Sequence, residues 1–545
     1  MTTPQIKSEP DEYDFIIVGA GSAGCVVANR LTEHKEWTSL LLEAGTEEPL
    51  AAEVPGLHCM LQKTKFDWNY HPKFDQYSSF CGETCVFWPR GKVMGGSSAL
   101  NLMMYVRGSR EDFNSWDKIG NPGWSYNDVL PYFKKSENNA DIQILRNNPE
   151  YHATGGYLNV ERYPYLDPNV KILTKAFEQL GYEQTDVNGK TQIGTMITQT
   201  TSKNGSRMST NVAFIRPIRN VRKNLFIKTQ VYVTKIIIDF ETKRAFGVEY
   251  TSTTTGESRT VYARKEVIVS AGAIESPKLL LLSGIGPPEE LKTHHIPLIK
   301  NLSVGLNLQD HVTNYFIQII PGNKSTSNTN CQEKIQDLNI YTNQKHGPLS
   351  TTGISAVTVL LQTKYEQNPE IPDISIYYEK IGVIVCLLSP DSRGFIQLNS
   401  TDPIWGAPEI YPKYFSAGTD MRRMIDGFRK VIQVFNTTIF KDYNFRLNDV
   451  PLVICNKYEF NSDMFWECVI KEFSYTEYHP VGTCKMGPKK DKDAVVDSRL
   501  RVYGINGLRV IDASIMQLIA RGNTNAPTIM IAEKGSDMIK EDWVQ

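Results

Sequence analysis

The chain has 545 residues, too many for a single hydrophobic core, which favours two domains or one domain with large insertions. A composition of 41% hydrophobic and 22% charged residues is typical of a soluble globular protein, and a net charge of −1 gives no reason to expect nucleic acid or an anionic membrane as partner. No apolar run approaches about 18 residues, so we expect no membrane span. The polar stretch Met1–Glu12 lacks the apolar core of a signal peptide, so none is expected in the chain as given.

The first predicted elements are a buried strand at Phe15–Val18 and a helix over Cys25–Leu31, joined by a glycine-rich turn. The turn has the pattern G-x-G-x-x-G, formed by Gly19, Gly21 and Gly24. In this pattern the first glycine permits a tight turn, the second leaves room for a pyrophosphate, and the third lets the helix pack closely on the strand. The pyrophosphate would lie on the free N–H groups at the positive end of the helix.

A second strand is predicted at Ser39–Glu43, and its last residue is an acid 19 positions beyond Gly24. At this distance a carboxylate binds the hydroxyl groups of an adenosine ribose. Strand, turn, helix and acid together predict a dinucleotide site. The charge of Glu43 disfavours a 2′-phosphate, but the pattern alone does not separate FAD from NAD.

Glycine and serine are dense in the next informative stretch, Trp88–Asn101. One interpretation is a loop with several turns. The other is a second contact surface for a large cofactor, in which backbone groups around Val93 and Gly96 approach it closely.

Short alternating strands are predicted between Lys223 and Ala263, at Thr229–Asp239 and Phe246–Ser252. They indicate an antiparallel meander inserted in an α/β protein. A buried parallel strand is then expected at Glu266–Ser270.

A helix is predicted after the turn Ala271–Ala273, with Ser276 as N-cap and Pro277 as its first residue, ending at Ser283–Gly286. Residues 315–375 are rich in polar side chains and lack clear periodicity. We expect them to form loops and insertions over a pocket.

The nine cysteines include two pairs at short spacing, Cys455 with Cys468 and Cys81 with Cys85. Two local disulfides would suggest a secreted protein, whereas the alternative is ordinary buried thiols. Five N-x-S/T sequons would fit a glycoprotein but are also expected by chance: Asn204, Asn301, Asn323, Asn399 and Asn436. Without CxxC pairs or histidine clusters, we expect no metal.

Two segments near the C-terminus carry side chains that could take part in catalysis or bind a cofactor. The first is Tyr478–Gly487, with the sequence YHPVGTCKMG. The second runs from Leu508–Ser514 through Gly522–Pro527 into a predicted helix at Thr528–Lys540. Asn and Pro at its start are typical of a helix N-terminus directed at an anion.

The ordered set of motifs resembles the glucose–methanol–choline (GMC) oxidoreductase family, and most closely its insect branch. The motifs that carry this resemblance are Gly19–Gly24, Gly91–Asn101, Gly272–Gly286, Gly305–His311, His479–Gly487 and Asp512–Asn525. Several separated motifs in the family order are far more specific than any one alone.

The resemblance implies an α/β fold of two lobes. The first is a Rossmann-like FAD-binding domain with a parallel sheet and an inserted antiparallel meander, formed by residues 13–160, 205–312 and 476–545. The second is an α+β substrate-binding domain, formed by residues 161–204 and 313–475.

The resemblance also implies FAD-dependent oxidation of a primary alcohol, of aromatic, terpenoid or sugar type, to the aldehyde or lactone by hydride transfer to flavin N5. O2 or a quinone-type acceptor would reoxidise the flavin, and the enzyme would be secreted, with a homodimer left open. His479 matches the family's catalytic histidine, and Asn523 matches a position that holds either histidine or asparagine. The matching cofactor-binding positions are Gly19, Gly21, Ser22, Ala23, Gly24, Glu43, Val93, Gly96, Ser97, Asn101, Leu102, Met104, Val233, Asp512, Ala513 and Asn523.

The chemistry explains these residue types. Removal of hydride from an alcohol carbon requires the hydroxyl proton to leave as well, and a neutral imidazole is a suitable base near neutral pH. Asn523 cannot act as a base, but its amide can hold the alcohol oxygen. Alternatives are a hydroxynitrile lyase or a catalytically silent binding protein on this fold, although the intact pair His479 and Asn523 argues against the silent protein.

The chain departs from the family pattern in two places. Met94 stands where the family motif usually has Leu, Ile, Val or Trp, which is a mild apolar change. Gln517 and Arg521 place unusual polarity just before Asn523. They indicate an altered substrate or acceptor preference, or else Arg521 points to solvent and has no such role.

Overall fold

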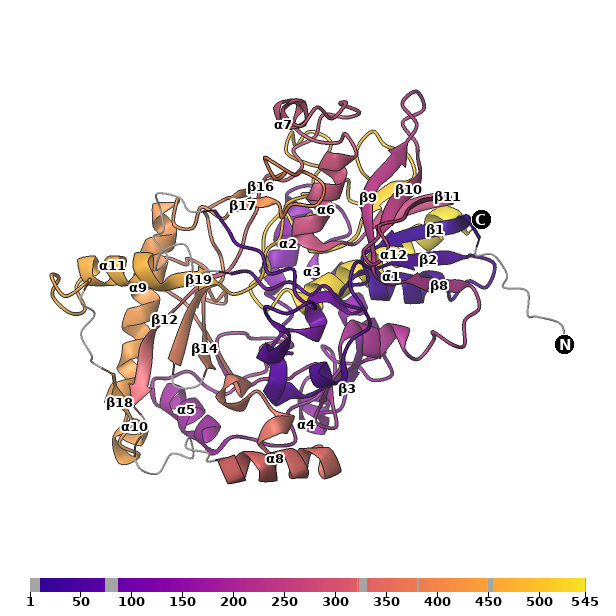
Figure 1. The fold of residues 1–545 in the computed structure, drawn as a ribbon. Coiled ribbons are helices and arrows are strands. Elements are labelled where there is room, and N and C mark those ends of the chain that lie inside the picture. The colour runs from indigo at the N-terminus through magenta and orange to yellow at the C-terminus, as the bar shows by residue number, and fades with distance from the viewer. Residues whose placement is uncertain are drawn as a thin grey trace.

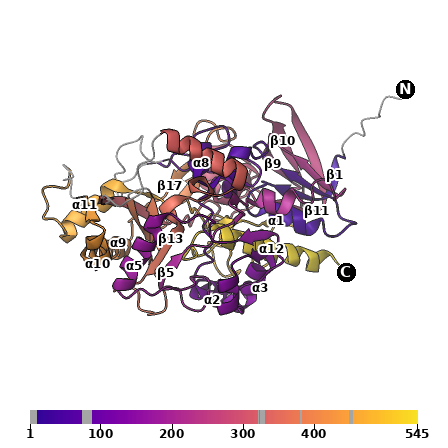
Figure 2. The same ribbon diagram turned by 90° about the horizontal axis from the view of Figure 1, so that it is seen from below.

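The computed structural model describes residues 10–73, 87–320, 322, 331–379, 382–448 and 454–544. Two seven-stranded sheets organise these residues, one at each side of the molecule in Figure 1. Seen from below in Figure 2, helices from distant parts of the chain lie against and between the sheets.

The first sheet has the order β8-β2-β1-β11-β10-β9, with β20 also paired to β11. β1, β2, β8 and β20 run parallel to one another and to the second half of β11, as expected for a Rossmann-like sheet. The strands are β1 (Glu12–Val18), β2 (Ser39–Leu42), β8 (Leu225–Lys228), β9 (Val231–Ile238), β10 (Ala245–Ser252), β11 (Ser258–Val269) and β20 (Leu508–Val510).

The predicted meander and parallel strand are confirmed, but they share one strand. The first half of β11 pairs antiparallel with β10, and its second half pairs parallel with β1. Because the strand continues without a break, the meander extends the parallel sheet and does not form a separate one.

Two helices at opposite ends of the chain cover this sheet next to its glycine-rich turn. α1 (Gly24–Leu31) follows β1 as predicted, and α12 (Asn525–Trp543) packs against both α1 and α3 (Tyr126–Ser136). The C-terminal helix begins three residues earlier than the sequence predicted and lies beside the helix that follows the glycine-rich turn (Figure 1).

The predicted start of the middle helix was wrong. α6 spans Gly272–Leu282, so Pro277 lies inside it and Ser276 is not the N-cap. Proline lacks the N–H that would bond the carbonyl four residues earlier. That carbonyl, on Ala273, instead accepts a hydrogen bond from the Thr483 hydroxyl at 2.6 Å. The Ser276 hydroxyl donates to Asp512, so tertiary contacts replace the cap.

The second sheet is antiparallel, with the order β18-β12-β15-β14-β13-β5 and β19 beside β12. The prediction of loops over residues 315–375 was wrong, because this stretch holds much of β12, all of β13 and α8 (Cys331–Gln344). β13 is buried at every position, so its sequence shows no alternation of polar and apolar residues. The strands are β5 (Gly194–Ile197), β12 (Val312–Ile320), β13 (Val357–Leu361), β14 (Ile374–Glu379), β15 (Gly382–Leu387), β18 (Arg446–Leu447) and β19 (Ser474–Thr476).

Helices α9 (Gly418–Val431) and α11 (Asp463–Phe473) pack beside this sheet, at the left of Figure 1. The other elements are α2 (Arg110–Lys118), α4 (Ile142–Asn147), α5 (Pro168–Gln179), α7 (Pro288–Thr293), α10 (Thr438–Asp442), β3 (Glu137–Asn139), β4 (Leu158–Val160), β6 (Ser202–Lys203), β7 (Ser206–Arg207), β16 (Phe395–Gln397) and β17 (Glu409–Tyr411). Both sheets draw strands from the ranges expected for them, while the domain boundaries themselves stay a prediction.

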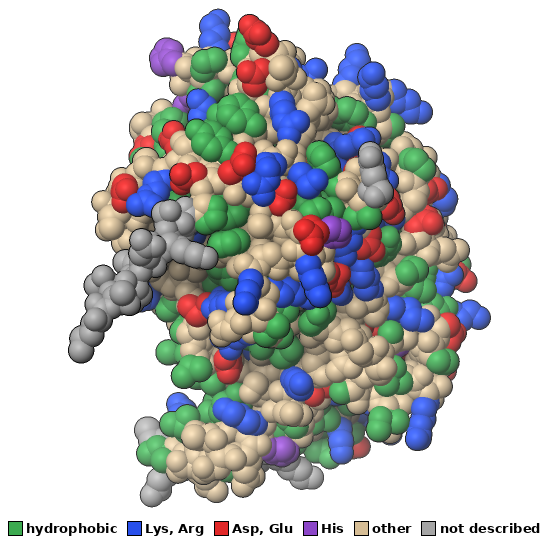
Figure 3. All heavy atoms as spheres, turned by 90° about the vertical axis from the view of Figure 1, so that its right-hand side faces the viewer, with side chains coloured by type: hydrophobic (Ala, Val, Ile, Leu, Met, Phe, Trp, Pro, Cys, Tyr) green, Lys and Arg blue, Asp and Glu red, His purple; other side chains and the backbone are tan. Residues whose placement is uncertain are grey.

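The face in Figure 3 carries basic and acidic side chains interspersed, without a broad field of one sign. Across the described ranges, no helix is both long enough and apolar enough to cross a membrane.

The predicted disulfide between Cys455 and Cys468 is present in the structure, with Cα atoms 5.9 Å apart. It joins the middle of α11 to the segment before that helix. The second predicted pair, Cys81 with Cys85, and the sequon at Asn323 lie outside the described residues.

Removal of this disulfide should destabilise the protein measurably. Replacing both cysteines by serine frees a loop with a sequence separation of 13. A disulfide that closes a loop of this length contributes about 2–4 kcal/mol to the free energy of unfolding. We expect that loss in urea titrations of the Cys455→Ser/Cys468→Ser variant. Reductant should destabilise the parent and leave the variant unaffected, and equal stability of the two proteins would contradict the pairing.

Candidate active site

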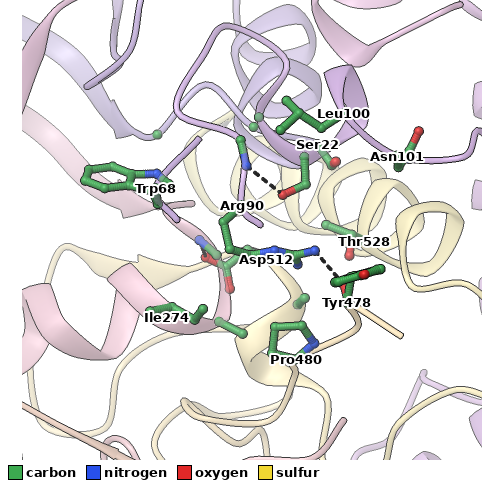
Figure 4. A pocket seen from close by; sticks show the side chains of 18 of the residues that line it. Ser22, Trp68, Arg90, Leu100, Asn101, Ile274, Tyr478, Pro480, Asp512 and Thr528 are labelled. Atoms are coloured by element: carbon green, nitrogen blue, oxygen red, sulfur yellow. Dashed lines mark hydrogen bonds between the residues drawn. The ribbon is translucent and has the colours of Figure 1, made fainter. Parts of the chain in front are cut away.

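One cavity of about 300 Å³ runs from the turn after β1 to the start of α12 (Figure 4). Its walls come from both sheets and from segments more than 400 residues apart in the chain. Of the residues predicted from the sequence, the following line it: Gly19, Gly21, Ser22, Ala23, Glu43, Gly96, Ser97, Asn101, Leu102, Met104, Val233, His479, Asp512, Ala513 and Asn523.

Two predicted cofactor residues do not line the cavity. Val93 is fully buried and packs with Ala99 and Leu100 behind the wall. Gly24 has the packing role expected of it, because a Cβ atom there would lie 1.8 Å from the Gly19 carbonyl oxygen. Its contribution is the close approach of α1 to β1.

The glycines of the turn have distinct geometries. Gly19 adopts a φ of +95°, where L side chains are strained. A Cβ on Gly96 would meet the Cα of Gly21 at 2.7 Å, so the turn and the 88–101 loop touch there. A Cβ on Gly21 would find only Gly96 Cα, at 3.9 Å. Gly21 therefore faces open space in the cavity, as a pyrophosphate site requires.

Glu43 directly follows β2 at one extremity of the cavity. Its two carboxylate oxygens accept hydrogen bonds from the backbone N–H groups of Ala20, at 2.9 Å, and Gly45, at 2.8 Å. Burial raises the pKa of this carboxyl to about 7, against the opposing effect of these hydrogen bonds. Each oxygen keeps a further lone pair for a ligand hydroxyl. Val233 of β9 lines the same cavity, and the backbone N–H of Val231 donates to the backbone carbonyl oxygen of Glu43 at 3.0 Å.

The C-terminal helix is tied directly to the glycine-rich turn. The Ser22 hydroxyl donates to Asn525 Oδ1 at 2.8 Å, and Thr524, Asn525 and Thr528 line the cavity. The free N–H groups and positive dipole end of α12 thus face the same cavity as those of α1. Asp512 is held by the backbone N–H of Gly272, at 2.8 Å, and by hydroxyl groups.

His479 and Asn523 meet at the other extremity of the cavity. His479 follows β19, and its backbone N–H donates to Asp310 Oδ1 at 2.9 Å. The Asn523 side-chain nitrogen lies 3.4 Å from His479 Nε2. Asn523 Oδ1 is buried and has no hydrogen-bond partner among the described residues. The amide can therefore turn toward a ligand placed beside the imidazole.

A second histidine fixes the proton on the first. His311 Nε2 lies 3.1 Å from the Leu388 carbonyl oxygen, which can only accept, so Nε2 carries the proton. Neutral His311 then has an accepting Nδ1, which lies 3.0 Å from His479 Nδ1. His479 must donate from Nδ1 in this contact. Its Nε2 is consequently unprotonated and directed at Asn523 and the cavity.

Both imidazoles stay neutral because of their surroundings. Burial lowers the pKa of His311 to about 3 and lowers the pKa of His479 well below 6.5. Arg90 adds to the effect on His479, since its guanidinium donates to the neighbouring Tyr478 carbonyl at 2.6 Å (Figure 4).

Sequence reasoning gave no role to several of these residues. Arg90 and Tyr478 line the cavity, whereas Asp310 and His311 hold His479 from behind. Asp310 and His311 do belong to the Gly305–His311 motif noted in the sequence, so the motif was visible. Their contacts with His479 span 169 and 168 residues and could not be read from spacing.

The two unusual polar residues before Asn523 have structural partners and do not line the cavity. Gln517 is buried, and its Oε1 accepts from Asn121 at 2.9 Å. Arg521 pairs with Asp112 at 2.5 Å and lies 3.5 Å from Glu366. Arg521 is therefore neither pointed at solvent nor placed to contact a substrate directly.

The cavity fits a flavin dinucleotide on its own geometry. The Glu43 carboxylate lies at one end, an open glycine turn and two helix N-termini follow, and at the other end a neutral imidazole lies beside an amide whose oxygen has no partner among the described residues. Within the described ranges, no group of three or more His, Cys, Asp and Glu side chains could hold a metal ion.

Comparison with known proteins agrees with this geometry. Two family models, both described as GMC oxidoreductase, match residues 13–313 and 390–532. A glucose dehydrogenase (FAD, quinone) of Drosophila melanogaster is 42% identical, over 99% of this chain and 88% of the relative. An ecdysone oxidase of Spodoptera littoralis is 34% identical, over 97% and 92%. The solved formate oxidase of Aspergillus oryzae superposes with a TM-score of 0.87 at 27% identity, covering 98% of this chain and 99% of that one.

Proposed function

Because the chain belongs to the GMC oxidoreductase family, whose cofactor is FAD, we propose that it oxidises a primary alcohol to the aldehyde or the anomeric hydroxyl of a sugar to the lactone. The observation that carries this proposal is the unprotonated Nε2 of His479, aimed into the cavity beside the Asn523 amide. When bound, FAD supplies the hydride acceptor at its N5 atom. The remaining tasks fall to side chains of this protein.

His479 is proposed to take the hydroxyl proton on Nε2. The tautomer set by His311 makes this nitrogen the acceptor, as a general base requires. The proton that arrives gives an imidazolium whose Nδ1–H stays hydrogen-bonded to His311. His311 thus acts through His479 and is a positioning residue.

Asn523 is proposed to donate to the alcohol oxygen through its side-chain nitrogen. An oxygen that bonds both Nε2 of His479 and the Asn523 amide places its carbon at a defined point of the cavity, which supports orientation for hydride transfer. The backbone bond from His479 to Asp310 keeps the imidazole in place while the proton moves.

The wall near this pair supports a substrate with an apolar body. Leu102, Met104 and Tyr315 line the cavity and belong to one hydrophobic cluster. The Tyr315 ring stacks on Tyr475 at 4.2 Å between centroids. Aromatic and terpenoid alcohols fit such a wall. The similarity to a glucose dehydrogenase and an ecdysone oxidase keeps sugar and steroid alcohols among the candidates.

The electron acceptor and the location of the enzyme are further parts of the proposal. O2 or a quinone-type compound would accept the electrons, and the enzyme would be secreted. The disulfide at Cys455 and Cys468 supports an oxidising compartment.

A substrate screen tests the proposed function. Benzyl alcohol, geraniol and glucose are mixed anaerobically with the purified yellow protein, and flavin bleaching is followed at its visible absorbance band. Oxygen consumption and quinone-dye reduction are then measured in parallel to identify the acceptor. Bleaching by a primary alcohol supports the proposal. Cleavage of a cyanohydrin without bleaching by any alcohol would favour the lyase.

The rate of flavin reduction should stay level as the pH falls through 6.5. His479 acts as a base only when neutral, and its pKa is lowered well below 6.5, so protonation and loss of rate occur only at lower pH. Anaerobic rates of flavin reduction, measured over a series of acidic pH values, locate the pH at which the rate falls. A decline centred at or above 6.5 would contradict the neutral, buried imidazole.

A further inference from the structure

Arg207 of β7 is a buried cation without a carboxylate partner. Only 2% of the residue is exposed, and among the described residues no acidic oxygen lies within ion-pair distance of it. All of its hydrogen bonds go to uncharged oxygens. Nε donates to the Ala52 carbonyl at 2.7 Å, and Nη1 donates to the Ser98 carbonyl at 3.2 Å.

The same guanidinium holds Asn101 at two points. Nη1 lies 2.7 Å from the Asn101 backbone oxygen and 2.8 Å from Asn101 Oδ1. A buried charge without a carboxylate in direct contact is costly. Burial lowers the pKa of Arg207 to about 10, against the opposing effect of the more distant Glu48. The side chain nevertheless remains protonated at neutral pH and gives charge-assisted hydrogen bonds, which are stronger than neutral ones.

These contacts determine how the Asn101 amide is turned. Its Oδ1 accepts from Arg207 and also from the backbone N–H of Met103 at 3.0 Å. With both lone pairs of the oxygen engaged, the amide cannot flip without losing two donors. Its NH2 group must lie on the opposite side. Asn101 lines the cavity at the end of the 88–101 loop (Figure 4).

We propose that Arg207 is a positioning residue that locks the Asn101 amide with its NH2 group directed at the flavin. It sets the equilibrium of flavin reduction through that donor. The inference rests on the proposed contact of Asn101 with the flavin and adds to it the residue that fixes the donor's direction. Ala52 lies on the segment Leu50–Glu53, so the same guanidinium also joins that segment to the loop.

The midpoint potential of bound FAD tests the proposal in a double-mutant cycle. Asn101→Ala removes the donor. Arg207→Lys keeps the charge but loses the planar guanidinium, whose separate nitrogens bond Ala52 and Asn101 at the same time. Each single variant should shift the reduction equilibrium about tenfold, about 30 mV for a two-electron couple. In the Asn101→Ala background, Arg207→Lys should add almost nothing, because the group through which it acts is gone.

The control is Arg216→Lys. Arg216 pairs with Glu53 at 2.6 Å on the same segment but has no bond to Asn101, so the potential should not move. The positioning role of Arg207 would be overturned if the shifts in midpoint potential of Asn101→Ala and Arg207→Lys added in the double variant. It would also be overturned if Arg207→Lys lowered the melting temperature but left the midpoint potential unchanged. If Asn101→Ala leaves the midpoint potential unchanged, the proposed contact of Asn101 with the flavin is contradicted, and with it the inference that depends on it. If neither Arg207→Lys nor Arg207→Gln yields folded holoprotein while Asn101→Ala does, Arg207 is structural and the inference falls.

Discussion

His479→Ala is expected to slow flavin reduction by alcohol on the order of a hundredfold or more while FAD stays bound. The variant loses Nε2 of His479, the acceptor nitrogen that lies beside the Asn523 amide. The cofactor-binding turn and the ribose carboxylate Glu43 lie at the far end of the cavity, so flavin content should be unaffected. Anaerobic stopped-flow bleaching with the best substrate of the screen measures the rate.

Asn523→Ala provides the internal comparison. It removes one oriented donor but no proton acceptor, which should cost about 2–3 kcal/mol of transition-state stabilisation. The His479 variant should therefore be at least as slow as the Asn523 variant. The His294→Ala variant changes a histidine directly after α7, whose Nε2 lies 3.6 Å from Glu290, and should reduce at the parent rate. If His479→Ala bleached as fast as the parent with the true substrate, the base assignment would be wrong.

Gly21→Leu should yield folded protein that lacks FAD and therefore has no activity. The reason is local: the nearest atom to a Cβ at this position is 3.9 Å away, so the new side chain meets no protein and fills the space of the pyrophosphate. Absorbance of the flavin relative to protein measures loading, and circular dichroism reports folding.

The matched variants separate loss of cofactor from loss of fold. Gly96→Ala should damage folding itself, because its Cβ would meet the Gly21 backbone at 2.7 Å. Gly418→Leu, at an exposed glycine with no atom within 4 Å of its Cβ, should keep both the fold and the flavin. A soluble Gly21→Leu protein with full flavin absorbance would contradict the placement of the pyrophosphate.

Local sequence patterns predicted the elements that bind the nucleotide. β1, the glycine turn, α1 and the acid at the end of β2 follow one another within 32 residues, Glu12 to Glu43, and each is specified by its own short-range chemistry. Prediction from such patterns failed for β13, because a strand buried on both faces shows no alternation of polar and apolar residues. It also failed at Pro277, because the carbonyl that loses its helical hydrogen bond there is satisfied by the distant Thr483 hydroxyl.

By itself, the sequence determined the family, the Rossmann-like sheet, the dinucleotide site and the positions of His479 and Asn523, because each depends on a motif contiguous in the chain. Only the tertiary structure decided which nitrogen of His479 is unprotonated and how Asn101 is turned. The first depends on His311, 168 residues away, and the second on Arg207, 106 residues away. A proton or an amide is oriented by its hydrogen-bond partner, and partners so distant are brought together only by the packing of the whole chain.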